Sequence, residues 1–506
     1  MPHKDVCDAL RRFSPAEVII MKRPFCSLAP ALLFGFAALS AQAQQTFVVN
    51  PGDSIQNAVD QAVAGDTVVV RPGTYTQRVS ISGKNGLSNA LITLKGDSGA
   101  IIDGTGLAPV GRQGLITIAN SSYIRVEGFE VRKFSGSGTE RMPVGILVQG
   151  FGSQLQVVNN KVHDIKNTST CKDPCLTGAH GIAAYGTTST GLTDLLFSGN
   201  EIYNNVLQAS EAFVINGNVN RFAVLNNHAH DNNNIGFDFI GYEGECSGCG
   251  DNDRVRNGII RGNTAANNTS TSNPWYDGEG SAAGFYVDGG RYLVFERNFS
   301  TGNDLGFEFA SEHAGKATED VVMMNNFVYN NREVGVSLGG YAANVGEARR
   351  ISVYNNSFYK NQGWGTEILF QYKVKDSRFA NNIFFGESSA AESYENSGNG
   401  HSGNVWGKNL WWGTSSSSSG LPGTTVVADP KYVAPTTGNL RLQSSSPAIN
   451  AGAVAADITS WSSTIWDVYF PPNGDIAPNG KTDINGQARI EGTIDLGADE
   501  YGTAAP

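Results

Sequence analysis

Charged residues are scarce in this chain, at 16% of its 506 residues. Helical enzymes are usually rich in Ala, Glu, Lys and Leu, and this sequence does not follow that pattern. Glycine is abundant instead, with 61 residues, and asparagine is dense between residues 115 and 386. Glycine and asparagine favour turns, whereas the Val, Ile, Phe and Tyr between them favour strands. The composition therefore predicts an all-β protein with many turns.

Apolar runs long enough to cross a membrane are absent after residue 43. Before that point, Met21-Lys22-Arg23 opens a basic region, Leu28–Leu39 is a short apolar stretch, and Ala41-Gln42-Ala43 is a small-residue cleavage site. This pattern is typical of a secretory signal peptide that begins at Met21. We expect residues 1–43 to be an upstream extension plus signal peptide, and the protein to be secreted or periplasmic, with no integral membrane segment.

An excess of positive charge is also lacking, since 36 Lys and Arg stand against 47 Asp and Glu. Without residues 1–43 the counts are 31 and 44, a net charge of about −13. An acidic protein is a poor partner for nucleic acid or anionic membranes, so neither is expected. A bound divalent cation would still allow an anionic substrate, because it inverts the local charge.

Cysteine is rare, and four of the six cysteines follow residue 43. In an exported protein, two short-range disulfides are the expected state of Cys171, Cys175, Cys246 and Cys249. A zinc site is a less favoured alternative, because the two pairs belong to separate repeats. Redox chemistry of a Cys-x-x-Cys motif would need a thioredoxin-like context, which the sequence lacks.

A repeat organises most of the chain. An asparagine follows an apolar strand-like segment at intervals of 40, 27, 36, 35, 28, 30 and 26 residues, at Asn160, Asn200, Asn227, Asn263, Asn298, Asn326, Asn356 and Asn382. A second short strand follows most of these positions. Short strands that stack coil on coil, with equivalent asparagines bonded to one another, explain this pattern. The sequence predicts a right-handed, single-stranded parallel β-helix, a solenoid whose variable intervals are insertions on the binding face.

The ends of the solenoid have their own signals. Residues 44–110 are expected to form an N-terminal cap and first coils, with an amphipathic capping helix from Ser54 to about Ala64. Residues 111–386 form the central β-helix with its asparagine ladder and cleft. Residues 387–430 are interpreted as a Ser/Gly-rich loop region, and residues 431–506 as C-terminal coils and a closing segment. A capped solenoid can be a monomer, and the oligomeric state stays open.

The N-terminal segment PGDSIQNAVDQAVAGDTVVVRPGTYTQRV, together with ALITLKGDSGAIIDGTG, resembles the cap and first coils of secreted β-helix proteins that act on polysaccharides, the pectate-lyase-like families. The segments SPAINAG and DINGQARIEGTIDLGADEYG resemble the end segment of many secreted bacterial β-helix proteins. The resemblance implies export, this fold and a polysaccharide substrate.

Alignment of the second strands on their glycines predicts one outward column of side chains, which contains Asp238, Tyr286, Glu308, Ser337 and Glu367. Neighbouring carboxyl groups on such a column repel one another, so they either act as acids or bind a cation. The candidate catalytic residues are Asp238, Tyr286, Asp288, Glu308, Glu312 and His313. The candidate substrate-binding residues are Trp275, Tyr276, Arg291, Lys316, Tyr341, Glu367 and Tyr372.

The segment HDNNNIGFDF resembles the calcium-site coil of the family-nine polysaccharide lyases, and SEAFVIN resembles the preceding coil. The resemblance implies β-elimination of a uronate polysaccharide with Ca²⁺ as cofactor, and it places Glu211 and Asp238 at acidic positions of the calcium site. The acidic column adds Asp288 and Glu308 as candidate calcium ligands. Asn234 and Ile235 depart from the acidic residues of that motif. Tyr286 stands where the family carries its catalytic lysine, which leaves a tyrosine as the candidate base.

Two other functions remain open. A glycoside hydrolase needs two carboxyl groups, one of them protonated, and Asp238, Asp288, Glu308 and Glu312 offer such pairs. A non-catalytic polysaccharide-binding or cell-surface protein needs only the exposed aromatic and polar face. His228 and His230 lie beside Asn227, in a predicted turn, and are interpreted as structural.

Overall fold

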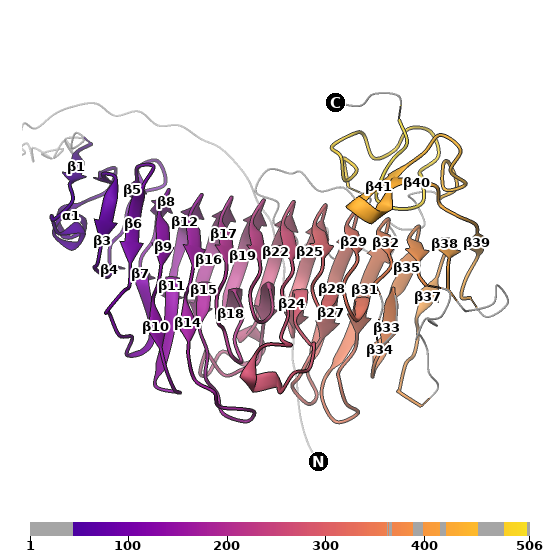
Figure 1. Ribbon diagram of the computed structural model, residues 1–506, viewed down its shortest axis with the longest axis horizontal. Coiled ribbons are helices and arrows are strands. Elements are labelled where there is room, and N and C mark those ends of the chain that lie inside the picture. Colours follow the sequence, from indigo (N-terminus) through magenta and orange to yellow (C-terminus); the bar gives the residue numbers. More distant parts are fainter. Residues whose placement is uncertain are drawn as a thin grey trace, which may run out of the picture. The chain divides into compact units, whose positions relative to one another are not determined.

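A computed structural model describes residues 44–361, 363, 367–387, 398–414, 421–453 and 480–502. The predicted signal peptide therefore lies outside the described residues. The described chain winds into a right-handed parallel β-helix whose coils contribute strands to three long parallel sheets, called A, B and C (Figure 1).

Sheet A consists, in spatial order, of β1 (Thr46–Val49), β2 (Thr67–Val70), β5 (Ile92–Gly96), β8 (Ile124–Glu127), β12 (Gly152–Val158), β16 (Leu192–Ser198), β19 (Val219–Leu225), β22 (Val255–Arg261), β25 (Arg291–Glu296), β28 (Ala317–Met324), β31 (Glu347–Tyr354), β35 (Arg378–Ala380) and β37 (Val405–Trp406), with β34 (Val374–Lys375) beside β31.

Sheet B consists of β3 (Gly73–Tyr75), β6 (Ala100–Asp103), β9 (Glu130–Arg132), β13 (Lys161–His163), β17 (Glu201–Tyr203), β20 (His228–His230), β23 (Thr264–Ala266), β26 (Phe299–Thr301), β29 (Phe327–Tyr329), β32 (Ser357–Tyr359), β36 (Ile383–Phe385), β38 (Asn409–Trp412) and β39 (Thr425–Val427).

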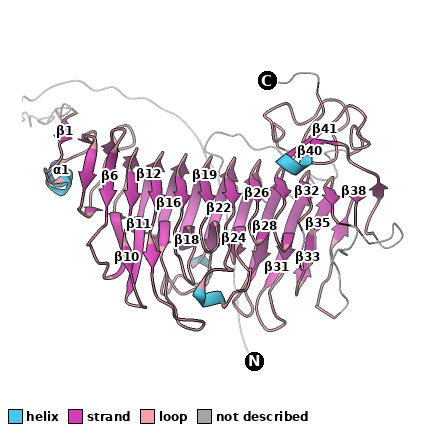
Figure 2. Ribbon diagram, viewed as in Figure 1, coloured by secondary structure: helices cyan, strands magenta, loops and turns pink. Residues whose placement is uncertain are grey.

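Sheet C consists of β4 (Val79–Ser82), β7 (Gly111–Ala119), β11 (Arg141–Gly150), β15 (His180–Gly186), β18 (Phe213–Gly217), β21 (Phe237–Ile240), β24 (Ala283–Asp288), β27 (Leu305–Ala310), β30 (Val334–Leu338) and β33 (Ile368–Phe370). A short pair, β10 (Ser135–Gly136) and β14 (Lys166–Asn167), lies outside these sheets. Helix is confined to α1 (Ile55–Gln61) and the 3-10 turns η1 (Gly250–Asn252), η2 (Pro274–Tyr276) and η3 (Pro435–Thr437) among the described residues (Figure 2).

Alternation along each strand fills the solenoid with apolar side chains. In sheet C the inward phenylalanines stack from coil to coil, with ring centroids 5.0 Å apart for Phe237 and Phe285 and 4.7 Å apart for Phe285 and Phe307. All three are fully buried in the main core. Their outward neighbours on the same strands are polar, which places polar groups on the outer face of sheet C.

The predicted asparagine ladder is confirmed. The side-chain amide of each ladder asparagine donates to Oδ1 of the next, at 3.1 Å from Asn160 to Asn200 and 3.0 Å from Asn298 to Asn326, and the chain continues beyond Asn382 to Asn409. These buried amides satisfy one another from coil to coil, which is what their burial requires.

A second ladder was missed by sequence reasoning. It runs five residues after the first, through Asn205, Asn232, Asn268, Asn303, Asn331 and Asn361. The signal was present in the sequence, because an asparagine follows each of six ladder positions at a spacing of five.

The helix expected near the N-terminus is present but shorter than predicted, spanning Ile55–Gln61. Ser54 caps it, since its hydroxyl accepts a hydrogen bond from the Asn57 backbone at 3.2 Å. Ile55 and Val59 are buried in the main core, so the helix covers apolar side chains of the first coils.

The C-terminal third differs from the sequence prediction in two places. Residues 398–414 and 421–427, expected as part of a loop region, add β37, β38 and β39 to sheets A and B, while Ser415–Ser419 lies outside the described residues. Residues 431–442 do not form coils, because β40 (Tyr432–Ala434) pairs antiparallel with β41 (Asn439–Leu442). This hairpin and residues 480–502 pack on the outer face of sheet B, around Leu410, Leu440 and Leu496.

No helix in the described part of the chain combines the length and apolarity that a membrane crossing requires. Both predicted disulfides are present, Cys171–Cys175 and Cys246–Cys249. They lie in the insertions 168–179 and 241–254, which correspond to the long intervals of the repeat.

Candidate active site

Sheet C positions the predicted acidic column. Its register pairs Asp238 with Tyr286, Tyr286 with Glu308, and Glu308 with Ser337, as the glycine alignment predicts. Asp288 lies two residues beyond Tyr286 on β24, and Glu312 follows the end of β27. The fold thus brings the acidic candidates from three coils to one face.

Glu367 is a correction to this column. Ser337 pairs with Leu369 and not with Glu367, so the alignment was wrong by two residues at the last strand. The Glu367 carboxylate accepts hydrogen bonds from the Asn361 side chain at 2.6 Å and from its backbone at 3.1 Å. Glu367 therefore takes the place of the next asparagine in the second ladder and is fully buried there.

Burial sets the electrostatics of the acidic face. Desolvation, with the charges of neighbouring carboxylates added to it, raises the pKa of Glu211, Asp238 and Asp288 well above the usual range. Desolvation also raises the pKa of Glu308 to about 8, and the negative charge of Glu312 adds to that shift. These groups therefore hold protons at a pH where ordinary carboxylates have lost them.

Glu312 is held differently from its neighbours. The Tyr286 hydroxyl donates to Glu312 Oε1 at 3.2 Å, and the Glu312 backbone N–H donates to Asp288 Oδ1 at 2.8 Å. Desolvation raises the pKa of Glu312, whereas the Tyr286 hydrogen bond and His313 oppose the rise. His313 Nε2 lies 3.9 Å from Asp288 Oδ2. Glu308 and Glu312 thus both have a raised pKa, and each accepts one side-chain hydrogen bond, from Gln371 and from Tyr286.

Sequence reasoning missed a group of residues at the other end of this face. Arg112, on β7, makes two hydrogen bonds to Glu245, at 2.7 and 2.8 Å, and its guanidinium lies 3.4 Å from the ring centroid of Tyr185. The Tyr185 hydroxyl lies 2.9 Å from His180 Nε2. Burial lowers the pKa of His180 to about 3, so its ring is neutral and accepts this bond. Nothing local in the sequence signals a contact between residues 133 positions apart.

Two hollows follow sheet C and share Arg112. One, of about 430 Å³, is lined by residues of both disulfide-bonded insertions and of the acidic face, among them Tyr185, Glu211, Glu243, Glu245 and His313. The other, of about 390 Å³, lies over β4, β7 and β11. The two hollows and the acidic face beside them are called the sheet C groove hereafter. Glu308 and Glu312 belong to the acidic face and are not among the residues that line either hollow.

The predicted substrate-binding residues separate into two groups. Tyr341 is 61% exposed, and the charges of Glu312 and Asp288 help to raise its pKa, so it lies beside the acidic face. Burial raises the pKa of Tyr276, with contributions from Glu211 and Glu312, which places it there too. Lys316 lies over the Tyr242 ring at 4.4 Å.

Arg291 lies away from the acidic face, whereas substrate binding by Trp275 and Tyr372 stays a prediction. Arg291 begins β25 on sheet A and pairs with Glu319 and Asp320, at 3.4 and 3.2 Å, because Gly289 and Gly290 turn the chain away from sheet C. Trp275 packs against the insertion that contains Cys175, and its Nε1–H donates a hydrogen bond to the Cys175 carbonyl. Tyr372 forms backbone bonds with Gly340 at the end of sheet C.

Two groups of described residues bring three or more potential ligand atoms within 4.8 Å of one another. One is Glu243, Asp288 and His313, and the other is Glu201, His228 and His230. Of the predicted calcium ligands, Asp288 belongs to the first group. Calcium binding by Glu211, Asp238, Asp288 and Glu308 stays a prediction.

No family model matches the chain. The uncharacterized protein YwoF of Bacillus subtilis (strain 168) is 33% identical over 368 residues, which cover 71% of this chain and 76% of YwoF. This chain belongs to the YwoF family.

Solved structures are similar to this YwoF family member in fold. A GH136 lacto-N-biosidase from Eubacterium ramulus has a TM-score of 0.50 at 12% identity, covering 72% of this chain and 67% of its own. Pectate lyase Pel9A has a TM-score of 0.46 at 15% identity, covering 91% and 97%. An alginate lyase from Paenibacillus sp. str. FPU-7 has a TM-score of 0.45 at 14% identity, covering 65% and 99%. The likeness concerns the fold alone, a parallel β-helix.

Proposed function

We propose that this protein is an exported enzyme that cleaves glycosidic bonds in a polysaccharide bound along the sheet C groove. The observation that carries the proposal is the pair formed by Glu308 and Glu312. Burial raises the pKa of both groups, that of Glu308 to about 8, and each accepts a hydrogen bond that favours its ionised form, from Gln371 and from Tyr286 respectively. Two neighbouring carboxyl groups, one of which keeps its proton near neutral pH, are suited to general acid and general base roles.

Hydrolysis is the reaction that this pair supports best. Glu308 would protonate the leaving oxygen, and Glu312 would act as the nucleophile or activate water. The two hollows that share Arg112 give the groove the length that an extended chain of sugars needs. The similar solved structures include glycoside hydrolases and polysaccharide lyases, which supports a carbohydrate substrate.

β-Elimination, which the sequence favours, is the second candidate. Burial raises the pKa of Tyr286, so little of its hydroxyl is ionised and available as a base. A specific observation still supports this reaction, because Glu243, Asp288 and His313 could hold a divalent cation beside the groove. Such a cation would neutralise the carboxylate of a uronate. Glu211, Asp238, Asp288 and Glu308 remain the predicted ligands if that cation is Ca²⁺.

The test is a panel of polygalacturonate, alginate, xylan and a neutral glucan, each incubated with the purified protein. Hydrolysis yields reducing ends without ultraviolet absorbance, whereas β-elimination yields an unsaturated product that absorbs, and it should stop when EDTA removes the cation. A binding protein would retard a polysaccharide in an affinity gel and release nothing, which would overturn the proposal.

Variants locate the site. Glu308→Gln and Glu312→Gln should each lower kcat by about 10²–10⁴-fold, because each removes one proton-transfer group. Glu140→Gln, an exposed carboxyl outside the groove, is the matched control and should leave kcat unchanged. Full activity in both groove variants would show that the reaction takes place elsewhere.

A further inference from the structure

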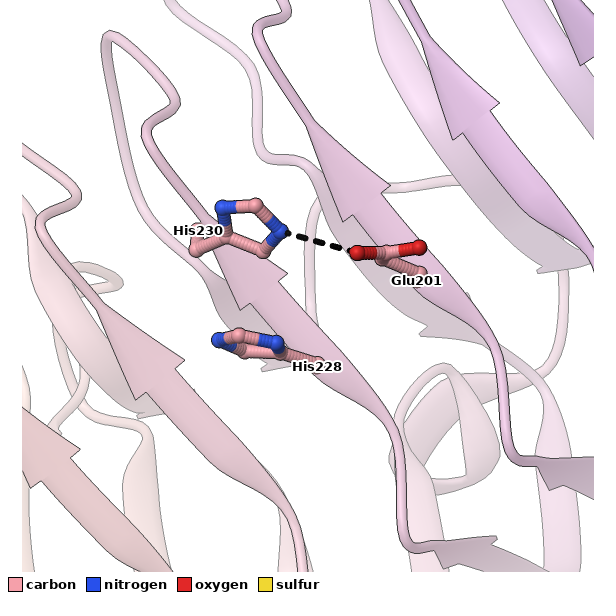
Figure 3. Close-up of side chains that lie close together, drawn as sticks. All are labelled: Glu201, His228 and His230. Atoms are coloured by element: carbon pink, nitrogen blue, oxygen red, sulfur yellow. Dashed lines mark ion pairs between the residues drawn. The ribbon is translucent and has the colours of Figure 1, made fainter.

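The sequence suggests that His228 and His230 are structural residues of a turn. In the structure they form a strand instead. β20 spans His228–His230 and pairs in parallel with β17, with Glu201 opposite His228 and Tyr203 opposite His230. Ala229 is buried in the core, so alternation directs both imidazoles to the outer face of sheet B. The side chains of Glu201, His228 and His230 therefore share one outer patch on two successive coils (Figure 3).

We propose that Glu201, His228 and His230 form a binding site for a zinc ion on the outer face of sheet B. Their potential ligand atoms all lie within 4.8 Å of one another, and His230 Nε2 is 3.5 Å from Glu201 Oε1. A tetrahedral zinc ion with ligand distances of about 2.0–2.1 Å needs ligand atoms roughly 3.4 Å apart. The measured spacing for this pair matches that requirement before any side chain moves.

The neighbours of His230 prepare its Nε2 for a metal. His230 Nδ1 lies 2.7 Å from Asp231 Oδ2, so Nδ1 carries the proton and donates it to the carboxylate. The lone pair is thereby left on Nε2, which faces Glu201 and has no hydrogen-bond partner among the described residues. A carboxylate on the far nitrogen of a metal-binding histidine is the usual arrangement around zinc.

The remaining contacts hold the ligands in position. The Tyr203 ring stacks on His230 with an angle of 4° and a centroid distance of 5.1 Å, and His163 stacks on the other side of Tyr203. Lys161 Nζ binds Glu201 Oε2 at 2.9 Å, which leaves Oε1 directed at His230. The side chains of His230 and Glu201 keep 18% and 34% of their surface exposed, so an ion reaches them from solvent.

The donor set selects the metal. Two imidazole nitrogens and one carboxylate oxygen suit zinc and other first-row divalent ions, whereas calcium and magnesium prefer oxygen ligands alone. Three protein ligands leave a fourth tetrahedral position for water. The site lies on sheet B, away from the sheet C groove, and it does not depend on the proposed reaction.

Isothermal titration of the chelator-washed, tag-free protein with Zn²⁺ tests the proposal, with the visible absorbance of Co²⁺ as a second readout of coordination. We expect one tight equivalent that His228→Ala and His230→Ala each weaken by at least about tenfold. Asp231→Asn should weaken binding less, because the ligand stays and only its orientation is lost. Zn²⁺ should also raise the midpoint of thermal unfolding, since the ion joins two coils.

Two controls separate this site from other histidines. His163→Ala removes a histidine from the same stack, and His313→Ala removes the histidine of the group beside the groove; both should keep the tight equivalent. Circular dichroism establishes that each variant is folded. The proposal is overturned if the protein binds no Zn²⁺, or if His228→Ala and His230→Ala bind as tightly as the wild type, or if His313→Ala alone abolishes binding.

Discussion

Glu308 lies between two inward phenylalanines, Phe307 and Phe309, and the alternation that buries both rings directs its carboxyl to the groove. Gln371 donates to Glu308 Oε1 at 3.2 Å, which is too weak a compensation for the water that the carboxyl loses. The groove is therefore acidic in composition but partly protonated in its ground state. Its protonated carboxyl groups can donate protons, but the folded state loses stability at high pH, where these groups become ionised.

A pH dependence of stability follows for Glu308. In the unfolded chain the group loses its proton near pH 4.5, whereas in the folded protein it keeps the proton until about pH 8. The folded state is thus relatively favoured at low pH and loses stability as the pH rises between these values. Glu308→Gln should be neutral at pH 4 and raise the free energy of unfolding by about 1–3 kcal/mol at pH 9, after allowance for solvent screening.

Urea unfolding of both proteins at the two pH values measures this difference. Glu140→Gln is the control and should follow the wild type throughout. Equal stability of Glu308→Gln and wild type at pH 9 would show that the Glu308 carboxyl is well solvated.

At the scale of elements, the strands are short, and the ladders join them. Sheet B strands have three or four residues, so each coil depends on the bonds that its turn makes to the next coil. The residue before a ladder asparagine helps to set the turn. Three such residues have left-handed backbone geometry with φ near +55°: Asn226, Asn325 and Asn355. Local sequence therefore specifies each turn, and stacking of the coils satisfies the hydrogen-bonding groups of that turn.

Removal of one ladder amide should be costly. Asn298 accepts from the backbone and side chain of Asn263 and donates to the Ile260 carbonyl and to Asn326. Asn298→Ala leaves these buried partners unsatisfied and should lower the free energy of unfolding by about 2–4 kcal/mol. Chemical denaturation measures the loss. Thr301→Ala, an outward change on the same coil, should alter it by less than about 0.5 kcal/mol; a similar loss in both would argue against the ladder as a source of stability.

The sequence predicts the elements well where the repeat is regular and less well where it ends. The ladder spacing locates every coil from Asn160 to Asn382, because an asparagine must recur wherever a buried turn needs an amide. Glu367 was misplaced by two residues, since a glutamate replaces the ladder asparagine there and the glycine signal alone did not fix the register. His228 and His230 were assigned to a turn because a polar pair has no apolar alternation to indicate a strand.

On the scale of the whole molecule, the C-terminal segment covers apolar side chains that the coils leave on the outer face of sheet B. Phe327, Tyr359, Ile383 and Leu410 are almost completely buried there, against Leu440 and Leu496. Ser357 accepts a hydrogen bond from the Ala498 backbone at 3.0 Å, which ties the segment to the solenoid. The segment thus stabilises the coils without being one of them.

A chain that ends at residue 430 should be less stable and less soluble, because it exposes those four side chains. Each buried side chain of this size contributes about 1.5–3 kcal/mol. Thermal unfolding should begin at a lower temperature, and a dye that reports apolar surface should bind. Leu496→Ala, with an expected loss of about 2–4 kcal/mol, tests the same contact in the full-length chain. An unchanged unfolding midpoint in both proteins would mean that the segment is dispensable.

The sequence by itself determined the coil repeat, the inward and outward faces of each strand, the asparagine ladder and the short-range disulfides. Each of these depends on residues close together in one coil or on a spacing that recurs. The tertiary structure alone shows which groups from distant insertions meet: Arg112 with Glu245, and Glu243 with Asp288 and His313. The reason is that insertions of unequal length fold back across the coils, and a local pattern does not record where they end.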